Sequence, residues 1–154
     1  MREFTEADRE KKKRRIQLPE NPGQLSPEAL SRLEEAVRAK AKDGLVPCPT
    51  AWRIAGEQGV SRLDVGVRID RLGLRVSDCQ LGCFQVGKTS RLGTAPEPAD
   101  PELARRVGAL YEKGELTCAN VFALAGELGA APRAAADAAN ARGHKLRQCQ
   151  LGCF

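Results

Sequence analysis

The chain has 154 residues and a formal net charge of +5, and it combines 42% hydrophobic residues with only 4% aromatic ones. This length suits one domain or two small ones, with a core built from leucine, valine, isoleucine and alanine. No apolar run is long enough to span a bilayer, and no apolar signal core follows the charged N-terminus, so we expect no membrane partner and a cytoplasmic location, where thiols stay reduced.

Residues 1–25 are predicted to form a charged arm, with a short helix capped at Thr5 that ends before the segment LPENPG. Within the arm, REKKKRR carries six positive charges and one negative charge. Such a cluster suits phosphate backbones through counterion release, and a solvated helix start that aids solubility is the alternative. The candidate phosphate contacts are Arg9, Lys11, Lys12, Lys13, Arg14 and Arg15.

The hexapeptide CQLGCF occurs twice, and it belongs to a longer internal repeat. Shifted by 70 residues, 44–84 aligns without a gap on 114–154, with 13 identities in 41 positions that include all six cysteines. The sequence therefore predicts a first repeat over 26–84, a linker over 85–100, rich in glycine, proline and small polar residues, and a second repeat over 101–154.

Each repeat is expected to contain three helices and a short strand. Ser26 or Asp100 caps the first helix, with proline next and a glycine stop at Gly44 or Gly114. A cysteine opens the second helix, a third helix follows, and LRVSD alternates as a strand does. The predicted fold class is mostly α: two tandem three-helix repeats with short β wings.

The turn between the second and third helices resembles the helix-turn-helix family, in its winged form. The residues that carry the resemblance are Ala55, Gly59 and Val60, and Ala125, Gly129 and Ala130. In that family the third helix enters the major groove of DNA and its side chains contact base edges. The resemblance implies these candidate DNA contacts: Arg62, Arg68, Arg71, Arg133, Asn140 and Arg142.

The third helix of the first repeat departs from this pattern because it is apolar on two faces. One face packs on the preceding helices; the second must meet something else, and DNA is a poor match for it. The corresponding helix of the second repeat is mostly alanine. These departures favour an alternative hypothesis, in which the chain is an accessory or adaptor subunit that docks on a protein partner.

The cysteines have the same spacing in both repeats, and we expect three thiols to converge in each. The predicted sets are Cys48, Cys79 and Cys83, and Cys118, Cys149 and Cys153. Three alternatives stay open: a zinc or iron–sulfur site that needs an external fourth ligand, buried structural thiols, or a redox disulfide between Cys79 and Cys83 or between Cys48 and Cys79. The lone His144 aligns with Leu74 and is interpreted as a surface residue of the wing.

Enzyme signals are nearly absent from the sequence. The segment GKTS at Gly87 lacks the upstream glycine of a phosphate-binding loop, and neither a carboxylate pair nor a cysteine–histidine pair recurs in the two repeats. The sequence therefore predicts a non-enzymatic protein that binds nucleic acid through tandem helix-turn-helix units and responds to metal or redox chemistry at its cysteines.

Overall fold

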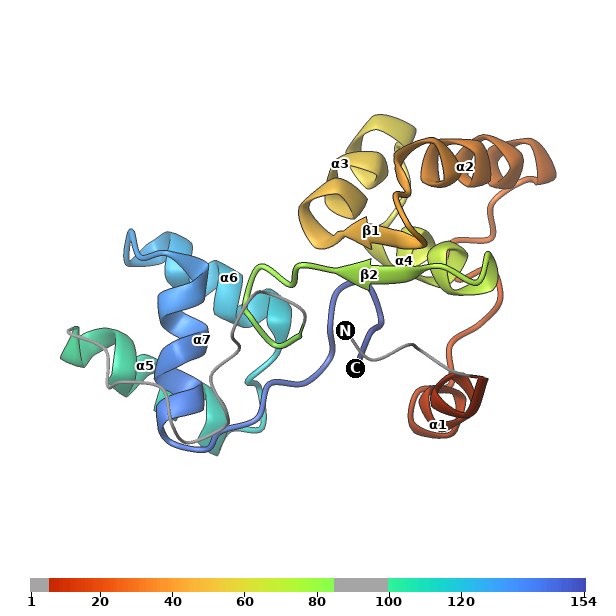
Figure 1. Ribbon diagram of the computed structural model, residues 1–154. Helices are drawn as coiled ribbons and strands as arrows, with labels where there is room; N and C mark the ends of the chain where they lie inside the picture. The colour runs from red at the N-terminus through yellow and green to blue at the C-terminus, as the bar shows by residue number, and fades with distance from the viewer. Residues whose placement is uncertain (1–5, 85–99) are drawn as a thin grey trace. The chain divides into compact units, whose positions relative to one another are not determined.

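The computed structural model describes residues 6–84 and 100–154, and these residues are mostly helical (Figure 1). The linker prediction, 85–100, and the expected cap at Thr5 lie outside the described residues, except for Asp100. Among the described helices, none is both long enough and apolar enough to cross a bilayer. The chain forms two compact units.

The first unit joins Met1–Val76 with Gln150–Phe154. Three of its helices pack against one another, and a two-stranded parallel sheet connects the strand before α3 with the strand after α4. A backbone bond from Arg75 N–H to the Gly44 carbonyl oxygen (2.9 Å) extends this pairing. The elements are α1 (Glu6–Arg15), α2 (Pro27–Lys40), β1 (Leu45–Pro47), α3 (Cys48–Gln58), α4 (Arg62–Arg71) and β2 (Arg75–Ser77).

Local capping explains where these helices begin. The Ser26 hydroxyl accepts a bond from the Ala29 N–H (3.2 Å) at the start of α2, as predicted. Ser61 and Asp64 form a reciprocal capping box at the start of α4. The end of α2 differs from the prediction, because the helix stops at Lys40 and the chain turns through residues 41–44 before β1.

The predicted arm is not separate from the first repeat. The Lys12 ammonium lies 3.1 Å from a carboxylate oxygen of Asp70 on α4. The Gly23 N–H donates to Asp64 at 2.7 Å, and Asp64 is only 4% exposed. The arm therefore covers part of α4 instead of projecting freely from the unit.

The second unit, Ser77–Cys149, contains three further helices that pack against one another. They are α5 (Pro101–Glu112), α6 (Cys118–Glu127) and α7 (Pro132–Ala141). Asp100 caps α5 as expected, by accepting the Glu102 N–H at 2.9 Å. The wing of this unit is reduced to an isolated parallel bridge between Thr117 and Arg147, so in the described residues only the first unit has the predicted strand pair.

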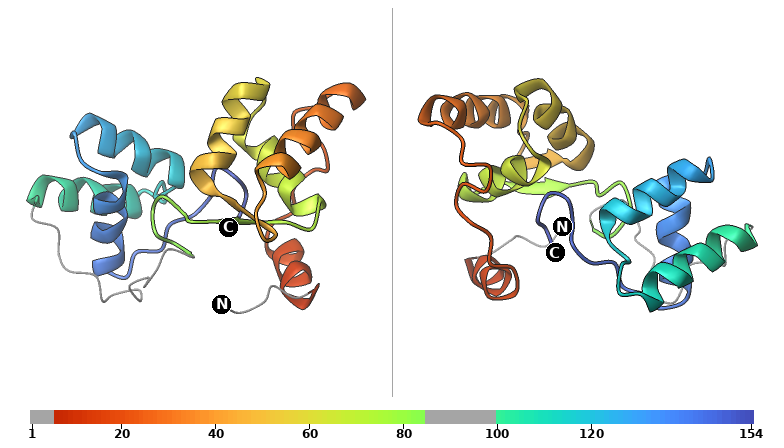
Figure 2. Two further views of the ribbon diagram at one scale, coloured as in Figure 1. Left: turned by 45° about the horizontal axis from the view of Figure 1, so that its top comes forward. Right: turned by 180° about the vertical axis from the view of Figure 1, so that it is seen from behind.

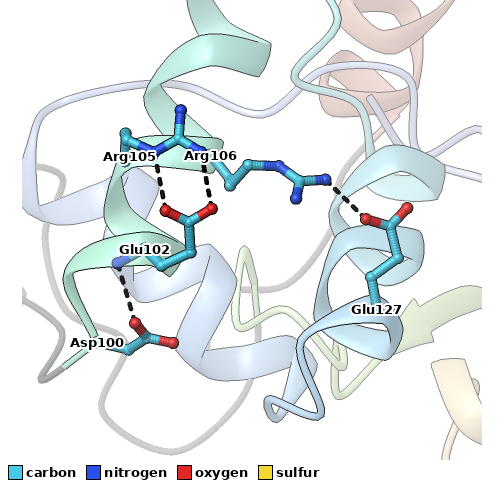
Figure 3. A network of polar contacts seen from close by, with 5 residues as sticks. All are labelled: Asp100, Glu102, Arg105, Arg106 and Glu127. Atoms are coloured by element: carbon cyan, nitrogen blue, oxygen red, sulfur yellow. Dashed lines mark hydrogen bonds and ion pairs between the residues drawn. The ribbon is translucent and has the colours of Figure 1, made fainter.

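A surface network links α5 to α6 in the second unit (Figure 3). Glu102 accepts two bonds from Arg105, at 2.7 and 2.8 Å. The next arginine, Arg106, reaches across to Glu127 at 2.7 Å. These side chains are largely solvent-exposed, so the network contributes little to the stability of the fold.

The boundaries of the two units differ from those of the sequence repeats. The second hexapeptide, apart from Cys149, packs in the first unit, and the first hexapeptide packs in the second unit. Leu151 is 1% exposed and Leu81 is 3% exposed, so the central leucine of each copy is buried in the unit built around the other repeat's helices. Each three-helix set is therefore completed by the hexapeptide of the other repeat.

Candidate functional site

The first hexapeptide folds into a tight turn that brings its two cysteines together. The Gly82 N–H donates to the Cys79 carbonyl oxygen at 2.8 Å, and the Cys79 N–H donates to the Phe84 carbonyl oxygen at 3.4 Å. Asp78 and Gly82 both have positive φ, 50° and 74°. The second copy repeats these angles within a few degrees (50° at Gln148 and 72° at Gly152), so the same sequence adopts the same turn twice.

This turn stabilises the thiolate form of Cys79. The hydrogen bond from the Cys83 side chain is the largest cause, and it lowers the pKa of Cys79 to about 6 together with backbone N–H donors of Cys83, Leu81 and Gly82. Burial of Cys79 acts in the opposite direction and is outweighed. At neutral pH Cys79 is therefore mainly an anion, which is the nucleophilic and metal-ligating form of the side chain.

Cys83 behaves in the opposite way, because it is the donor in this pair. Its hydrogen bond to Cys79 is the largest cause that raises the pKa of Cys83, and desolvation of the sulfur adds to it, although the residue as a whole is exposed. The charges of Cys79, Cys118 and Cys149 raise it further. The four thiols of the second unit therefore share one electrostatic environment.

Backbone pairing places the other two thiols of this environment. Cys118 begins α6, and its N–H donates to the Arg147 carbonyl oxygen at 3.1 Å. Cys149 follows two residues after that paired position. The turn after β2 lies beside the first turn of α6 (Figures 1 and 2). The electrostatic influence of Cys118 and Cys149 on Cys83 agrees with this placement.

The observed grouping of cysteines differs from the predicted one. The second unit contains Cys79, Cys83, Cys118 and Cys149, whereas Cys48 and Cys153 belong to the first unit. None of the six cysteines forms a disulfide. In the part of the chain that the structure describes, no three histidine, cysteine, aspartate or glutamate side chains are arranged to hold a metal ion. Zinc or an iron–sulfur cluster therefore stays a prediction without a formed site.

The predicted DNA contacts of α4 are engaged inside the first unit. The Arg62 guanidinium stacks over Trp52, 3.4 Å from the ring centroid, and donates to the Gln150 side-chain oxygen at 2.5 Å. Arg68 pairs with Glu34 at 3.1 Å. In addition, Arg71 lies 3.6 Å from Glu20.

The predicted contacts of α7 are engaged in a similar way inside the second unit. Arg133 pairs with Asp137 at 3.1 Å, and Arg142 donates to the Ala104 carbonyl oxygen at 3.3 Å. Asn140 is only partly exposed. Contact of Arg133 or Arg142 with a base edge would therefore have to replace the interactions that these two side chains already make.

The cationic side chains of the arm are more accessible to a phosphate than the arginines of α4 and α7. Lys11 and Arg14 are exposed on α1, and Lys13 pairs with Glu10 at 2.7 Å on the same surface helix. Lys12 is committed to α4, and the side chains of Arg9 and Arg15 lie outside the described part of the chain.

His144 lies in the segment after α7, where the sequence predicted a surface residue of the wing, and it is partly exposed. Its ring stacks on Tyr111 with a centroid distance of 3.8 Å and an interplanar angle of 2°. This packing gives His144 a structural role at the end of α5. Comparisons of this chain with models of protein families, with curated protein sequences and with solved structures found no match.

Proposed function

We propose that this chain is a non-enzymatic regulatory protein whose Cys79–Cys83 pair responds to oxidants in the cytoplasm. The observation that supports this proposal is the contact between two thiols: the buried Cys79 sulfur accepts a hydrogen bond from the Cys83 side chain, which lowers the pKa of Cys79. Both members of a disulfide are thus in contact before any oxidant arrives, and one of them is already in the reactive form.

Hydrogen peroxide is small enough to reach a buried sulfur, and it is the two-electron oxidant in the proposed reaction. The Cys79 thiolate attacks one peroxide oxygen, the O–O bond breaks, and Cys79 becomes a sulfenic acid while hydroxide leaves. The Cys83 sulfur then attacks the Cys79 sulfur, its proton leaves with the hydroxyl group as water, and a disulfide forms. Two electrons pass from the thiols to the peroxide.

The test is peptide-resolved mass spectrometry of the reduced full-length protein after peroxide treatment. The expected first product is the Cys79–Cys83 disulfide, formed before oxidation of Cys48 or Cys118, which are buried and lack the same turn. The Cys83→Ser variant should instead accumulate the sulfenic acid at Cys79. First oxidation at other cysteines, with Cys79 untouched, would overturn the proposal.

Nucleic-acid binding is a second candidate function, and the cationic helix α1 favours it. Its sequence EADREKKKRR has six basic and three acidic residues. Because the arginines of α4 and α7 are engaged, we assign the DNA contacts to phosphates and to the arm, and not to base edges. Such binding would be largely independent of sequence.

A salt titration with duplex DNA tests this second function. Replacing Lys11 and Arg14 with serine removes two exposed cations and should reduce the slope of log K against log salt by about 2. A matched variant, Lys145→Ser, removes one exposed cation of the second unit and should leave the slope nearly unchanged. Undetectable binding of the wild type at low salt would exclude this function.

We also infer that each three-helix set is a helix-turn-helix-like unit with a short wing. The turn between α3 and α4 at Gly59 and the strands β1 and β2 support this for the first unit. The adaptor hypothesis has less support, since the second apolar face of α4 is covered within the unit. Among the described residues, Tyr111 is the one large hydrophobic side chain that is exposed.

A further inference from the structure

The face of α4 around Gly66 holds the second hexapeptide closely. A Cβ atom at Gly66 would overlap the backbone carbonyl of Leu151, so the main chains of helix and hexapeptide are in direct contact. At Gly152, a Cβ atom would meet the side chains of Leu18 and Leu63. Leu151 itself is 1% exposed.

A polar contact fixes the position of the segment on this face. The Arg62 guanidinium lies between the Trp52 ring and the Gln150 side chain, which accepts its hydrogen bond at 2.5 Å. Trp52 is the only tryptophan of the chain. The fluorescence of Trp52 should therefore change when the glutamine of a hexapeptide occupies or leaves this position beside Arg62.

The second unit has a corresponding arrangement. There Gly82 lies against Arg133 of α7, and Arg133 aligns with Leu63 in the 70-residue repeat. The same position of the third helix thus contacts the same glycine of a hexapeptide in both units. Because the same contact between the third helix and a hexapeptide occurs in both units, we attribute it to the repeat itself.

We propose that the α4 face around Gly66 is a peptide-binding groove for a Gln-Leu-Gly segment, and that the CQLGCF segment of a second copy of this chain can occupy it. The two hexapeptides of the chain are identical, so contacts to these residues cannot distinguish one copy from the other. The chain's own second hexapeptide is favoured only because it is covalently attached, which gives it an effective concentration in the millimolar range. The groove accepts another copy when that advantage is removed.

The experiment uses the full-length chain under reducing conditions with Leu151 replaced by aspartate, which cannot be buried in the groove. The free hexapeptide CQLGCF is titrated in, and Trp52 fluorescence is recorded. We expect saturable binding to the variant and an apparent dissociation constant at least about tenfold weaker for the wild type, whose own segment competes. The peptide CQDGCF should produce no change.

A second variant keeps the test decisive if the aspartate prevents folding. Leu151→Ala weakens the packing of the chain's own hexapeptide without adding a charge. This variant should bind the peptide with an affinity between those of the wild type and Leu151→Asp. Adding Gly66→Val to either variant should abolish binding, because the new side chain fills the position of the Leu151 carbonyl. A folded Leu151 variant that does not bind CQLGCF, or that binds CQDGCF equally well, would overturn the proposal.

Discussion

Replacing Cys83 with alanine should raise the pH at which Cys79 becomes reactive. The Cys83 side chain is the largest contributor to the lowered pKa of Cys79, and alanine removes this donor while the backbone N–H groups remain. Because the pKa of Cys79 lies below its ordinary value, the thiolate is present above about pH 6 and disappears as the pH falls through that value.

The size of the change follows from the strength of the hydrogen bond. A bond to a charged group contributes about 1.5–3 kcal/mol, and one pKa unit corresponds to about 1.36 kcal/mol. The pKa of Cys79 should therefore rise from about 6 to between about 7 and 8, which is still below the ordinary value of 9.0 for a cysteine thiol. The thiolate fraction at pH 7 would fall from about 90% to between about 10% and 50%.

The assay is the pH profile of methylthiolation by methyl methanethiosulfonate, a small reagent, followed at Cys79 by mass spectrometry. The midpoint of the profile is more informative than the rate at one pH, since a thiolate of higher pKa is also the stronger nucleophile and partly compensates for its lower population. Cys83→Ser is the matched control, because its hydroxyl group still donates. If the alanine variant kept the wild-type midpoint, or if serine and alanine shifted it equally, the assigned hydrogen bond would be wrong.

Four further substitutions test the packing and the backbone conformation, and urea denaturation measures the free energy of unfolding of each. Leu151→Ala should destabilise the first unit by about 2–5 kcal/mol, as expected for a buried leucine. Asp64→Ala should cost about 2 kcal/mol or more, since it removes the buried carboxylate that accepts the Ser61 N–H and the Gly23 N–H. Gly59→Ala should cost about 1 kcal/mol because φ is +65°, whereas Gly56→Ala, in the exposed interior of α3, should stabilise by a similar amount.

Local features of this fold could be predicted because their causes are local. The cap at Ser26, the helix start at Cys48 and the glycine at the end of α3 each depend on a few neighbouring residues, and the structure confirms them. The end of α2 was misplaced because Gly44 marks the turn into β1 rather than the last helical residue. A glycine pattern alone does not distinguish these two uses.

The grouping of the thiols could not be predicted because the repeat hides it. The two hexapeptides are identical, so the sequence carries no sign that Cys79 and Cys83 pack with the helices of the other repeat. One difference between the repeats bears on which hexapeptide packs where: Gly66 aligns with Ala136. Glycine at position 66 allows the Leu151 backbone to lie against α4, because a Cβ atom there would overlap the Leu151 carbonyl. Its meaning becomes clear only once the position of Leu151 is known.

The two-faced apolar character of α4 connects the fold with the functional question. The sequence required that the second face be covered, and Val65 and Ile69 on α4 are buried, with the Leu151 backbone lying against Gly66. The same hexapeptide engages Arg62, because the Gln150 side chain accepts a hydrogen bond from its guanidinium. A ligand that needs Arg62 must therefore compete with Gln150 for this guanidinium, so binding of such a ligand and packing of the hexapeptide through Gln150 would oppose each other.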